Sequence, residues 1–224
     1  MNVSMCMTRE PVTIGPEMLL TEAAALMARK KIRRLLVVEP HPGGPHLLGS
    51  ITANDILYAF PPEVNPFAVI VTPAAREATL TAGKIMQRHL HTTTPEAPIE
   101  EAAAVMRDKK ISSLPVLREK HLVGLITESD IFRAFVGLFE IQGSGARITF
   151  DVSTGEDVFG LVARLSQKHG VQVTSLIRGM QDHQPICVTR VEGKKVDNFL
   201  EDIWSSGHQV MNVIRFAAPP GGNK

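Results

Sequence analysis

The stretches Gly49-Ser-Ile-Thr-Ala-Asn-Asp55 and Gly124-Leu-Ile-Thr-Glu-Ser-Asp130 share one pattern. Each has a glycine, an isoleucine two positions later, a threonine directly after it, and an aspartate three residues after the threonine. The apolar and β-branched residues up to the threonine predict a strand, and the apolar residues after the aspartate predict a helix. The threonine and the aspartate of each stretch therefore flank the N-terminus of a predicted helix.

These stretches belong to a longer internal repeat. Residues 12–38 and 91–117 are identical at 13 of 27 positions, and residues 47–57 and 122–132 at 6 of 11. Between the matched parts, the first copy has a Pro- and Gly-rich segment that is longer than its counterpart, as is typical of a surface turn between strands. The sequence thus predicts one structural unit that is present twice.

Both copies predict the element order β-α-β-β-α. A Thr-containing segment is followed by an Ala-rich helix whose apolar residues recur at i, i+3, i+4 and i+7, and paired lysines end this helix. Because neither copy has enough helix to cover its sheet on both sides, we expect two α+β units packed sheet to sheet as a pseudo-symmetric pair. The apolar helix positions are Leu20, Ala23, Ala24 and Met27 in one copy and Ile99, Ala102, Ala103 and Met106 in the other.

The duplicated stretches resemble the end of CBS domains, G-h-h-T-x-x-D. The strands Ile32-Arg-Arg-Leu-Leu-Val and Ile111-Ser-Ser-Leu-Pro-Val resemble the strand before it. CBS domains come in tandem pairs called Bateman modules, and the resemblance covers residues 1–140. It implies a regulatory site for AMP, ADP or ATP without a covalent cofactor. In the family the threonine hydroxyl contacts a phosphate beside a helix N-terminus, and the aspartate accepts hydrogen bonds from both ribose hydroxyls.

The resemblance implies a set of binding residues in each copy. Backbone groups of the Thr-containing segment would contact the adenine, and the isoleucine before the next strand would form a wall with its neighbours. In the second copy the residues are Thr92, Thr93, Ile111, Ser112, Ser113, Pro115, Thr127 and Asp130. In the first copy they are Thr13, Ile14, Ile32, Arg33, Arg34, Thr52 and Asp55. The alternative is that Thr52 and Thr127 act only as helix N-caps.

The two predicted sites differ in charge. Arg33-Arg34 stands where the second copy has Ser112-Ser113, and neighbouring strand residues face opposite sides, so one of each pair faces the cleft. A guanidinium suits a polyphosphate, so we expect the first copy to accept ATP or ADP and the second to prefer AMP. The alternative is that the arginines form a solvated strand end. Because Leu36 replaces the family's proline, which the second copy keeps as Pro115, we expect the second site to be the better preserved.

Residues 147–217 predict the βαββαβ order of a ferredoxin-like domain. Apolar residues alternate at positions 148, 150 and 152, and two amphipathic helices are expected to end at Gly170 and Gly207. The region resembles an ACT domain, a regulatory module that often binds amino acids between subunits. Its first turn, Ser153-Thr-Gly155, lacks the proline of the usual D-x-P-G turn, so a dimerisation domain without a ligand is the alternative. A CBS pair with an ACT-like domain is similar to acetoin-utilisation accessory proteins.

The breaks between these patterns predict the domain boundaries. Proline-rich and Gly/Ser-rich stretches end helices and favour flexible chain. The predicted segments are CBS repeat 1 (1–61), a linker (62–83), CBS repeat 2 (84–141), a Gly/Ser joint (142–146), the ACT-like domain (147–217) and a disordered tail (218–224).

Composition and the remaining motifs narrow the class of protein. A net charge of +1 gives no reason to expect nucleic acid or a membrane as a partner. Cys6 and Cys187 lack metal-type spacing and the eight histidines are scattered, so neither a metal site nor a catalytic residue is predicted. Without a signal peptide or an apolar span, the sequence predicts a cytoplasmic protein.

We therefore expect a homodimeric regulatory protein that is not an enzyme and acts allosterically on an unidentified protein partner. The alternative is an enzyme subunit or a structural dimerisation protein whose CBS sites are vestigial.

Overall fold

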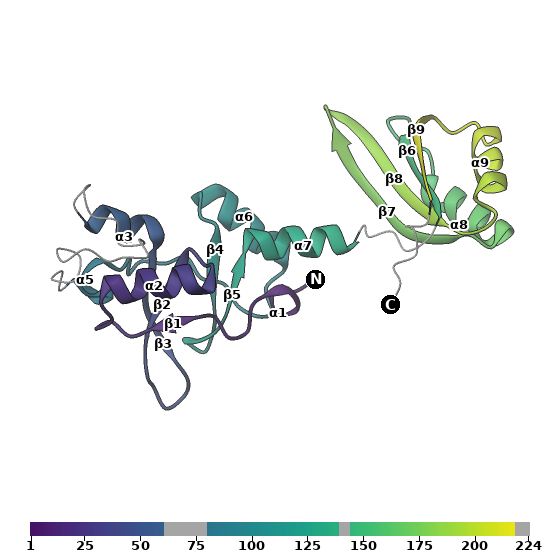
Figure 1. Ribbon diagram of the computed structural model, residues 1–224. Helices are drawn as coiled ribbons and strands as arrows, with labels where there is room; N and C mark the ends of the chain where they lie inside the picture. Colours follow the sequence, from purple (N-terminus) through teal and green to yellow (C-terminus); the bar gives the residue numbers. More distant parts are fainter. Residues whose placement is uncertain (61–79, 139–143, 218–224) are drawn as a thin grey trace. The chain divides into compact units, whose positions relative to one another are not determined.

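The computed structural model describes residues 1–60, 80–138 and 144–217 (Figure 1). The chain divides into two compact units, Met1–Ala134 and Phe135–Lys224. The first unit contains the two repeats, and the second contains the C-terminal sheet. The predicted tail 218–224, most of the predicted linker and residues 142–143 of the predicted joint lie outside the described residues.

The first repeat has the predicted order β-α-β-β-α. Its elements are β1 (Thr13–Ile14), α2 (Leu20–Lys30), β2 (Arg34–Glu39), β3 (His46–Thr52) and α3 (Ala53–Ala59). Helix α2 buries Leu20, Ala23, Ala24 and Met27, which are the positions that the helical spacing predicts. The helix ends where Lys31 adopts a left-handed conformation with φ of 54°, so the paired lysines mark its C-terminus as predicted.

The second repeat follows the same plan with a shorter first strand. A single parallel bridge, Thr93 to Val116, stands in place of β1. Its elements are α6 (Ile99–Lys109), β4 (Ser113–Arg118), β5 (His121–Thr127) and α7 (Glu128–Leu138). The turn between β4 and β5 has two residues in left-handed conformation, Glu119 and Lys120, whereas β2 and β3 are separated by a longer turn. This difference in turn length is the one predicted from the repeat.

The N-terminal segment, residues 1–8, packs on the second repeat although it precedes the first. It contains α1 (Val3–Cys6). Val3 N donates to Ala97 O at 2.9 Å, and Thr8 pairs with Leu125 of β5. Val3 is fully buried in the core of the second repeat. The apolar residues at the start of the chain thus complete the core of the second repeat, and the predicted range 1–61 for repeat 1 stays a prediction.

Residues 80–87, which precede the second repeat, pack on the first repeat. They contain α5 (Ala82–Ile85). Leu20 N donates to Leu80 O at 3.0 Å, and Gln87 pairs with Ser50 of β3. Ala82 and Met86 belong to the core of the first repeat. Residues 80–83 of the predicted linker thus pack against the first repeat, and the predicted boundaries 62–83 and 84–141 stay predictions.

The glycine of each duplicated stretch lies where another part of the chain crosses the sheet. Residues 80–87 cross at Gly49, and residues 1–8 cross at Gly124. A Cβ atom added to Gly49 would lie 2.6 Å from the carbonyl oxygen of Gln87. A Cβ atom added to Gly124 would lie 2.6 Å from the Met7 sulfur and 3.0 Å from the Thr8 carbonyl oxygen. The crossing therefore leaves no room for a Cβ atom at position 49 unless the Gln87 backbone shifts, whereas at position 124 the Met7 side chain would have to move.

The two repeats join edge to edge. The strand order is β1-β2-β3-β5-β4, and β3 meets β5 at one register pair, His46 with His121. The buried residues of the two repeats form separate clusters. Within the described residues, β3 and β5 are thus the strands through which the two repeats meet, and the sheet-to-sheet packing stays a prediction.

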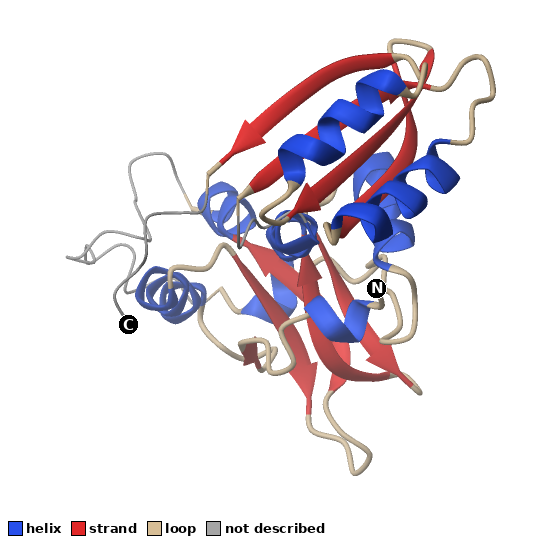
Figure 2. Cartoon of the chain, turned by 90° about the vertical axis from the view of Figure 1, so that its right-hand side faces the viewer, coloured by secondary structure: helices blue, strands red, loops and turns tan. Residues whose placement is uncertain are grey.

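The second unit has the predicted element order β-α-β-β-α-β (Figure 2). Its antiparallel sheet has the strand order β7-β8-β6-β9, and both helices contribute to the same buried cluster as the strands. Ala146 is fully buried there, so residues 145–146 of the predicted joint instead begin a strand. The elements are β6 (Gly145–Asp151), α8 (Val158–His169), β7 (Gln172–Gln181), β8 (Gln184–Glu192), α9 (Val196–Ser205) and β9 (Val210–Phe216).

Gly49→Ala is expected to destabilise the first unit by about 1–3 kcal/mol, because the added methyl group pushes against the Gln87 backbone. The matched control is Gly15→Ala in the same repeat, where an added Cβ meets nothing within 4 Å. The measurement is thermal and urea unfolding followed by circular dichroism. Equal stability of the two variants would contradict the crossing geometry.

Acid should destabilise the second unit through Asp202. Its Oδ2 accepts from Lys168 Nζ and His169 Nε2, each at 2.6 Å. These bonds hold the pKa of Asp202 below its usual value of about 3.9. A lowered folded-state pKa stabilises the fold above the unfolded-state value, and this contribution is lost as pH falls through the folded-state pKa.

Asp202→Asn should therefore make the unfolding midpoint less sensitive to pH below about 4. The fluorescence of Trp204, the chain's one tryptophan, reports on this unit. Glu201→Gln, at the exposed neighbouring position, is the control and should keep the acid sensitivity of the parent.

Candidate functional site

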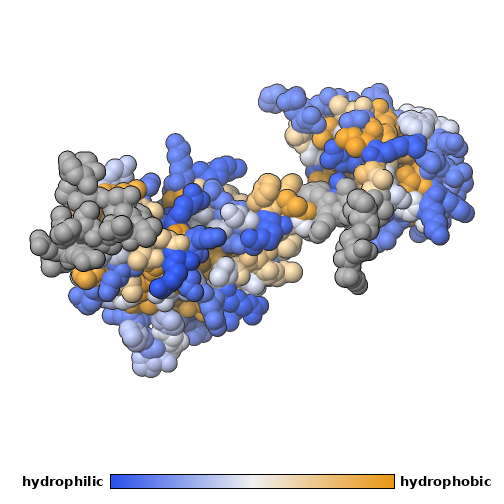
Figure 3. All heavy atoms as spheres, in the orientation of Figure 1, coloured by the Kyte–Doolittle hydropathy of each residue, from blue (hydrophilic) through white to orange (hydrophobic). Residues whose placement is uncertain are grey.

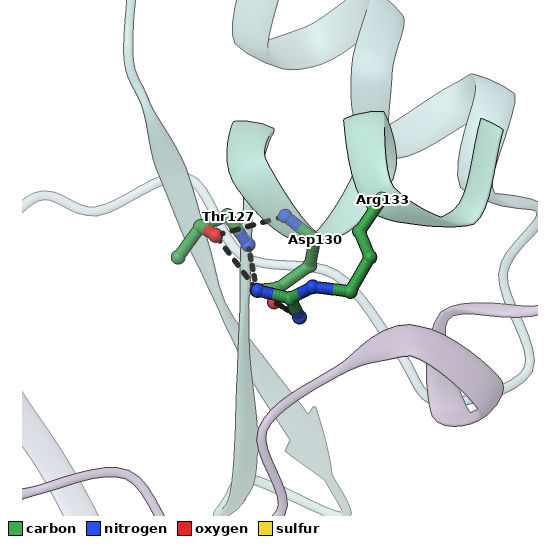
Figure 4. A network of polar contacts seen from close by, with 3 residues as sticks. All are labelled: Thr127, Asp130 and Arg133. Carbon is green, nitrogen blue, oxygen red and sulfur yellow. Dashed lines mark hydrogen bonds and ion pairs between the residues drawn. The ribbon is translucent and has the colours of Figure 1, made fainter. Parts of the chain in front are cut away.

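In each T-x-x-D pattern the threonine and the aspartate are hydrogen-bonded to each other at the start of a helix. Figure 4 shows the pair of the second repeat. At the start of α7, Thr127 Oγ1 donates to Asp130 Oδ2 at 2.7 Å, and Thr127 N donates to the same oxygen at 3.0 Å. Asp130 N donates back to Thr127 Oγ1 at 3.2 Å. At α3 the bonds between Thr52 and Asp55 are the same, at 2.7, 2.7 and 3.2 Å. Both pairs are therefore capping boxes.

This geometry limits what the threonine can do. A hydroxyl has one hydrogen to donate, and Thr52 and Thr127 each give it to an aspartate. A phosphate could receive that hydrogen only if the bond to the aspartate were broken. The N-cap alternative for these threonines therefore describes the geometry that the structure has. The other carboxylate oxygen, Oδ1, takes no part in the capping hydrogen bonds, and in Asp130 it accepts from Arg133.

In the first repeat, Arg34 is the arginine beside the cap. It is the register partner of Thr52 across β2 and β3 and is half-buried, whereas Arg33 is exposed. Arg34 Nη1 donates to Ser50 Oγ at 3.0 Å. Burial lowers the pKa of the Arg34 guanidinium, and the Asp55 carboxylate partly offsets this by raising it. The positive charge is thus partly withdrawn from water and interacts electrostatically with the Asp55 carboxylate.

In the second repeat, Ser113 occupies the corresponding position. It is the register partner of Thr127 and is 6% exposed, whereas Ser112 is exposed. Its Oγ is buried and has no hydrogen-bond partner among the described residues. A buried hydroxyl without a partner is unfavourable.

The segments predicted to contact a base lie beside the same strands. Thr13 and Ile14 pair in parallel with Leu36 and Val37 of β2. In the second repeat, Thr93 N donates to Pro115 O at 3.0 Å. The side chain of Ile14 is buried in the core of the first repeat, and Thr92 is exposed. Ile32 and Ile111 pack partly buried against the cores of their own repeats.

A shallow hollow of about 470 Å³ lies at the far end of β1 and β2 from Thr52 and Asp55. It brings together the Thr-containing segment and the long turn of the first repeat. Its lining residues are Thr13, Ile14, Gly15, Val38, Glu39, Pro40, His41, Gly44 and Pro45. The hollow includes two of the predicted base-contacting residues and neither member of the capping box.

Two residues near the sites were missed from the sequence. Ser50 holds Arg34, and Arg133 Nη1 donates to Asp130 Oδ1 at 3.1 Å (Figure 4). The i, i+3 spacing of Asp130 and Arg133 on a predicted helix was a signal that could have identified the second pair. Nothing in the local sequence links Ser50 to Arg34, because the strands that carry them meet only in the sheet.

Within residues 1–60, 80–138 and 144–217, no group of three or more His, Cys, Asp or Glu side chains is arranged to hold a metal ion. No helix in the same ranges has the length and apolar character needed to span a bilayer.

A pair of β-α-β-β-α repeats with a capped T-x-x-D helix start in each copy defines a tandem CBS module. The family model for the CBS domain matches residues 3–62 and 82–137. This is more than half of the chain, and the chain therefore belongs to the CBS domain family.

Known proteins resemble the chain over this module. A protein described as acetoin utilization protein AcuB from Vibrio cholerae has a structure with a TM-score of 0.52 and 30% identity, covering 63% of this chain and 95% of that one. CBSX2, solved in complex with AMP, has a TM-score of 0.51 and 20% identity over 62% of this chain and 98% of that one, a likeness in fold.

Homoserine O-acetyltransferase from Methanohalobium evestigatum is 31% identical over 132 residues, 58% of this chain. The chain spans 23% of that enzyme's length, and the likeness concerns the CBS region alone.

Ser113→Ala should leave the ligand-free protein as stable as the parent or more stable by about 1 kcal/mol, because it removes a buried hydroxyl without a partner. Denaturant unfolding measures this, and Ser112→Ala at the exposed neighbour is the control. A loss of stability in Ser113→Ala alone would mean that the hydroxyl is bonded within the fold.

Proposed function

We propose that the protein is a regulatory sensor that binds AMP, ADP or ATP in its CBS module. The observation that carries this proposal is the Ser113 hydroxyl, which is buried without a partner beside the capped N-terminus of α7. Membership of the CBS family supports a regulatory module of this type. The cap, the helix N-terminus and the hydroxyl together offer a carboxylate, N–H groups and a hydroxyl to one small molecule.

The binding roles follow from the groups that the cap leaves available. The Oδ1 atom of Asp130 can accept from ribose hydroxyls in exchange for the exposed Arg133, whose ion pair is weak in water. The N–H groups of the first turn of α7 would receive a phosphate. Ser113 would complete the set by a hydrogen bond to the nucleotide. In the first repeat, Asp55 would take the role of Asp130, and Arg34 would take the place of Ser113. Thr52 would cap the start of α3.

The two sites are proposed to differ in ligand. Arg34 brings a cation to the first site, which suits the added charge of ATP or ADP, whereas Ser113 brings a neutral hydroxyl that suits AMP. The first site would also have backbone contacts and side-chain walls from Thr13, Ile14, Ile32 and Arg33. The corresponding residues of the second site are Thr92, Thr93, Ile111, Ser112 and Pro115.

The mechanism we propose is allosteric. Nucleotide at the repeats would change how the repeats pack, and a protein partner would respond to that change. Linkage requires that such a partner alter the affinity for nucleotide by the same factor. The similar enzyme is related through its CBS region, which supports a regulatory rather than a catalytic role for this cytoplasmic protein.

We further propose that the second unit is an ACT-like, ferredoxin-like domain that joins two chains. Its β-α-β-β-α-β order supports that assignment. Apolar side chains are grouped on the face of this unit in view in Figure 3. The exposed large apolar residues of its two edge strands are Ile177, Met180, Met211 and Ile214. Such residues favour an interface between protein chains.

A second candidate is a structural dimerisation protein whose CBS sites are vestigial. The two capping boxes favour it, because the hydroxyl hydrogens of Thr52 and Thr127 are already used within the fold. This candidate predicts no nucleotide binding, so one titration separates the two.

Calorimetric titration with AMP and ATP tests the proposal on the parent chain and on Asp55→Ala and Asp130→Ala. We expect Asp130→Ala to lose most of the AMP binding and Asp55→Ala most of the ATP binding. Removal of a hydrogen-bond acceptor for two ribose hydroxyls should lower affinity by about tenfold or more. Circular dichroism must show that both variants fold, since loss of a cap costs about 1 kcal/mol. Equal affinity and preference in both variants would contradict two unlike sites.

A further inference from the structure

Ser50 is a buried serine whose hydroxyl accepts from Arg34. It is 1% exposed in β3, and Arg34 Nη1 donates to its Oγ at 3.0 Å. Its backbone is fixed from the other side by Gln87. Ser50 N donates to Gln87 O at 3.0 Å, and Gln87 N donates to Ser50 O at 2.9 Å. The hydroxyl therefore has a fixed position, and the guanidinium is bonded to it.

The second repeat replaces both members of this pair. Ser50 is the register partner of Leu36, and Leu125 is the register partner of Pro115, so Leu125 occupies the place of Ser50. Ser113 likewise occupies the place of Arg34. The hydroxyl and the guanidinium thus occur together in one copy and are absent together from these positions in the other. An apolar residue at 125 also supplies no side-chain acceptor for Ser113.

The guanidinium is hydrogen-bonded to the hydroxyl and interacts electrostatically with a carboxylate. Arg34 is the register partner of Thr52, and the Asp55 carboxylate is close enough to raise the pKa of Arg34 against the effect of burial. An arginine has five N–H donors in a planar fork, so one bond to Ser50 leaves others for an anion. A long side chain that is anchored at one point loses less freedom when it binds a ligand.

We propose that Ser50 is a positioning residue that holds the Arg34 guanidinium beside Asp55 and thereby sets the preference of the first site for ATP over AMP. This inference rests on the proposed function and names the residue that makes the two sites unlike. AMP has one phosphate, which a helix N-terminus can receive, whereas the further phosphates of ATP need a cation. Ser50 acts through Arg34 and contacts no ligand itself.

The experiment is calorimetric titration of the full chain with AMP and with ATP in an Asp130→Ala background, which removes the ribose acceptor of the second site. Ser50→Ala should reduce the ratio of ATP to AMP affinity by about 3- to 10-fold, through the ATP affinity, because one hydrogen bond that orients the guanidinium is lost. Arg34→Ser should reduce the ratio at least as much. In the Arg34→Ser background, Ser50→Ala should have no further effect on the ratio, since the pair acts as one unit.

Ser205→Ala, at an exposed serine of the second unit, is the control and should leave the ratio unchanged. The inference is overturned if Ser50→Ala keeps the parent ratio, or if it lowers the ratio equally with and without Arg34. A Ser50→Ala variant that weakens AMP and ATP alike acts through structure alone and overturns it too. If the parent chain binds neither nucleotide, the proposed function itself is wrong, and this inference is wrong with it.

Discussion

The close crossing of backbone over Gly49 and Gly124 is the constraint on which the CBS module depends. Residues 80–87 pass over β3 at Gly49, and residues 1–8 pass over β5 at Gly124. Each crossing segment adds buried residues to the core of a repeat. Neither core is complete without a segment from outside its own repeat, so the two repeats depend on each other although their cores are separate.

The crossings also place the candidate sites. Ser50 directly follows Gly49 and is hydrogen-bonded through its backbone to Gln87, so the residue that holds Arg34 is anchored by the crossing segment. In both repeats the threonine of the capping box comes three residues after the glycine. A shift of the strand at the glycine would therefore move the start of the helix. The hydrogen bonds of Ser50 to Gln87 and to Arg34 thus link the crossing segment to the first candidate site.

Much of the module follows from local sequence. The helix over residues 20–30, its buried stripe and its lysine end are dictated by 3.6-residue periodicity and by helix-end preferences, which act over a few neighbouring residues. The order of elements in the second unit follows from the same local rules. In this unit β7 and β8 are joined by the two-residue turn Asp182-His183, in which both residues adopt positive φ.

The sequence by itself determined that one β-α-β-β-α unit occurs twice and that T-x-x-D lies at a helix start in each copy. It also determined that the first copy has arginines where the second has serines. Only the tertiary structure decided that the lead segments are exchanged and that the repeats meet at an edge. It also decided that Arg34 is held by Ser50, whereas Ser113 has a buried hydroxyl without a partner among the described residues. The physical reason is range: periodicity and capping involve neighbours in the chain, whereas burial and hydrogen-bond satisfaction depend on residues that only packing brings together.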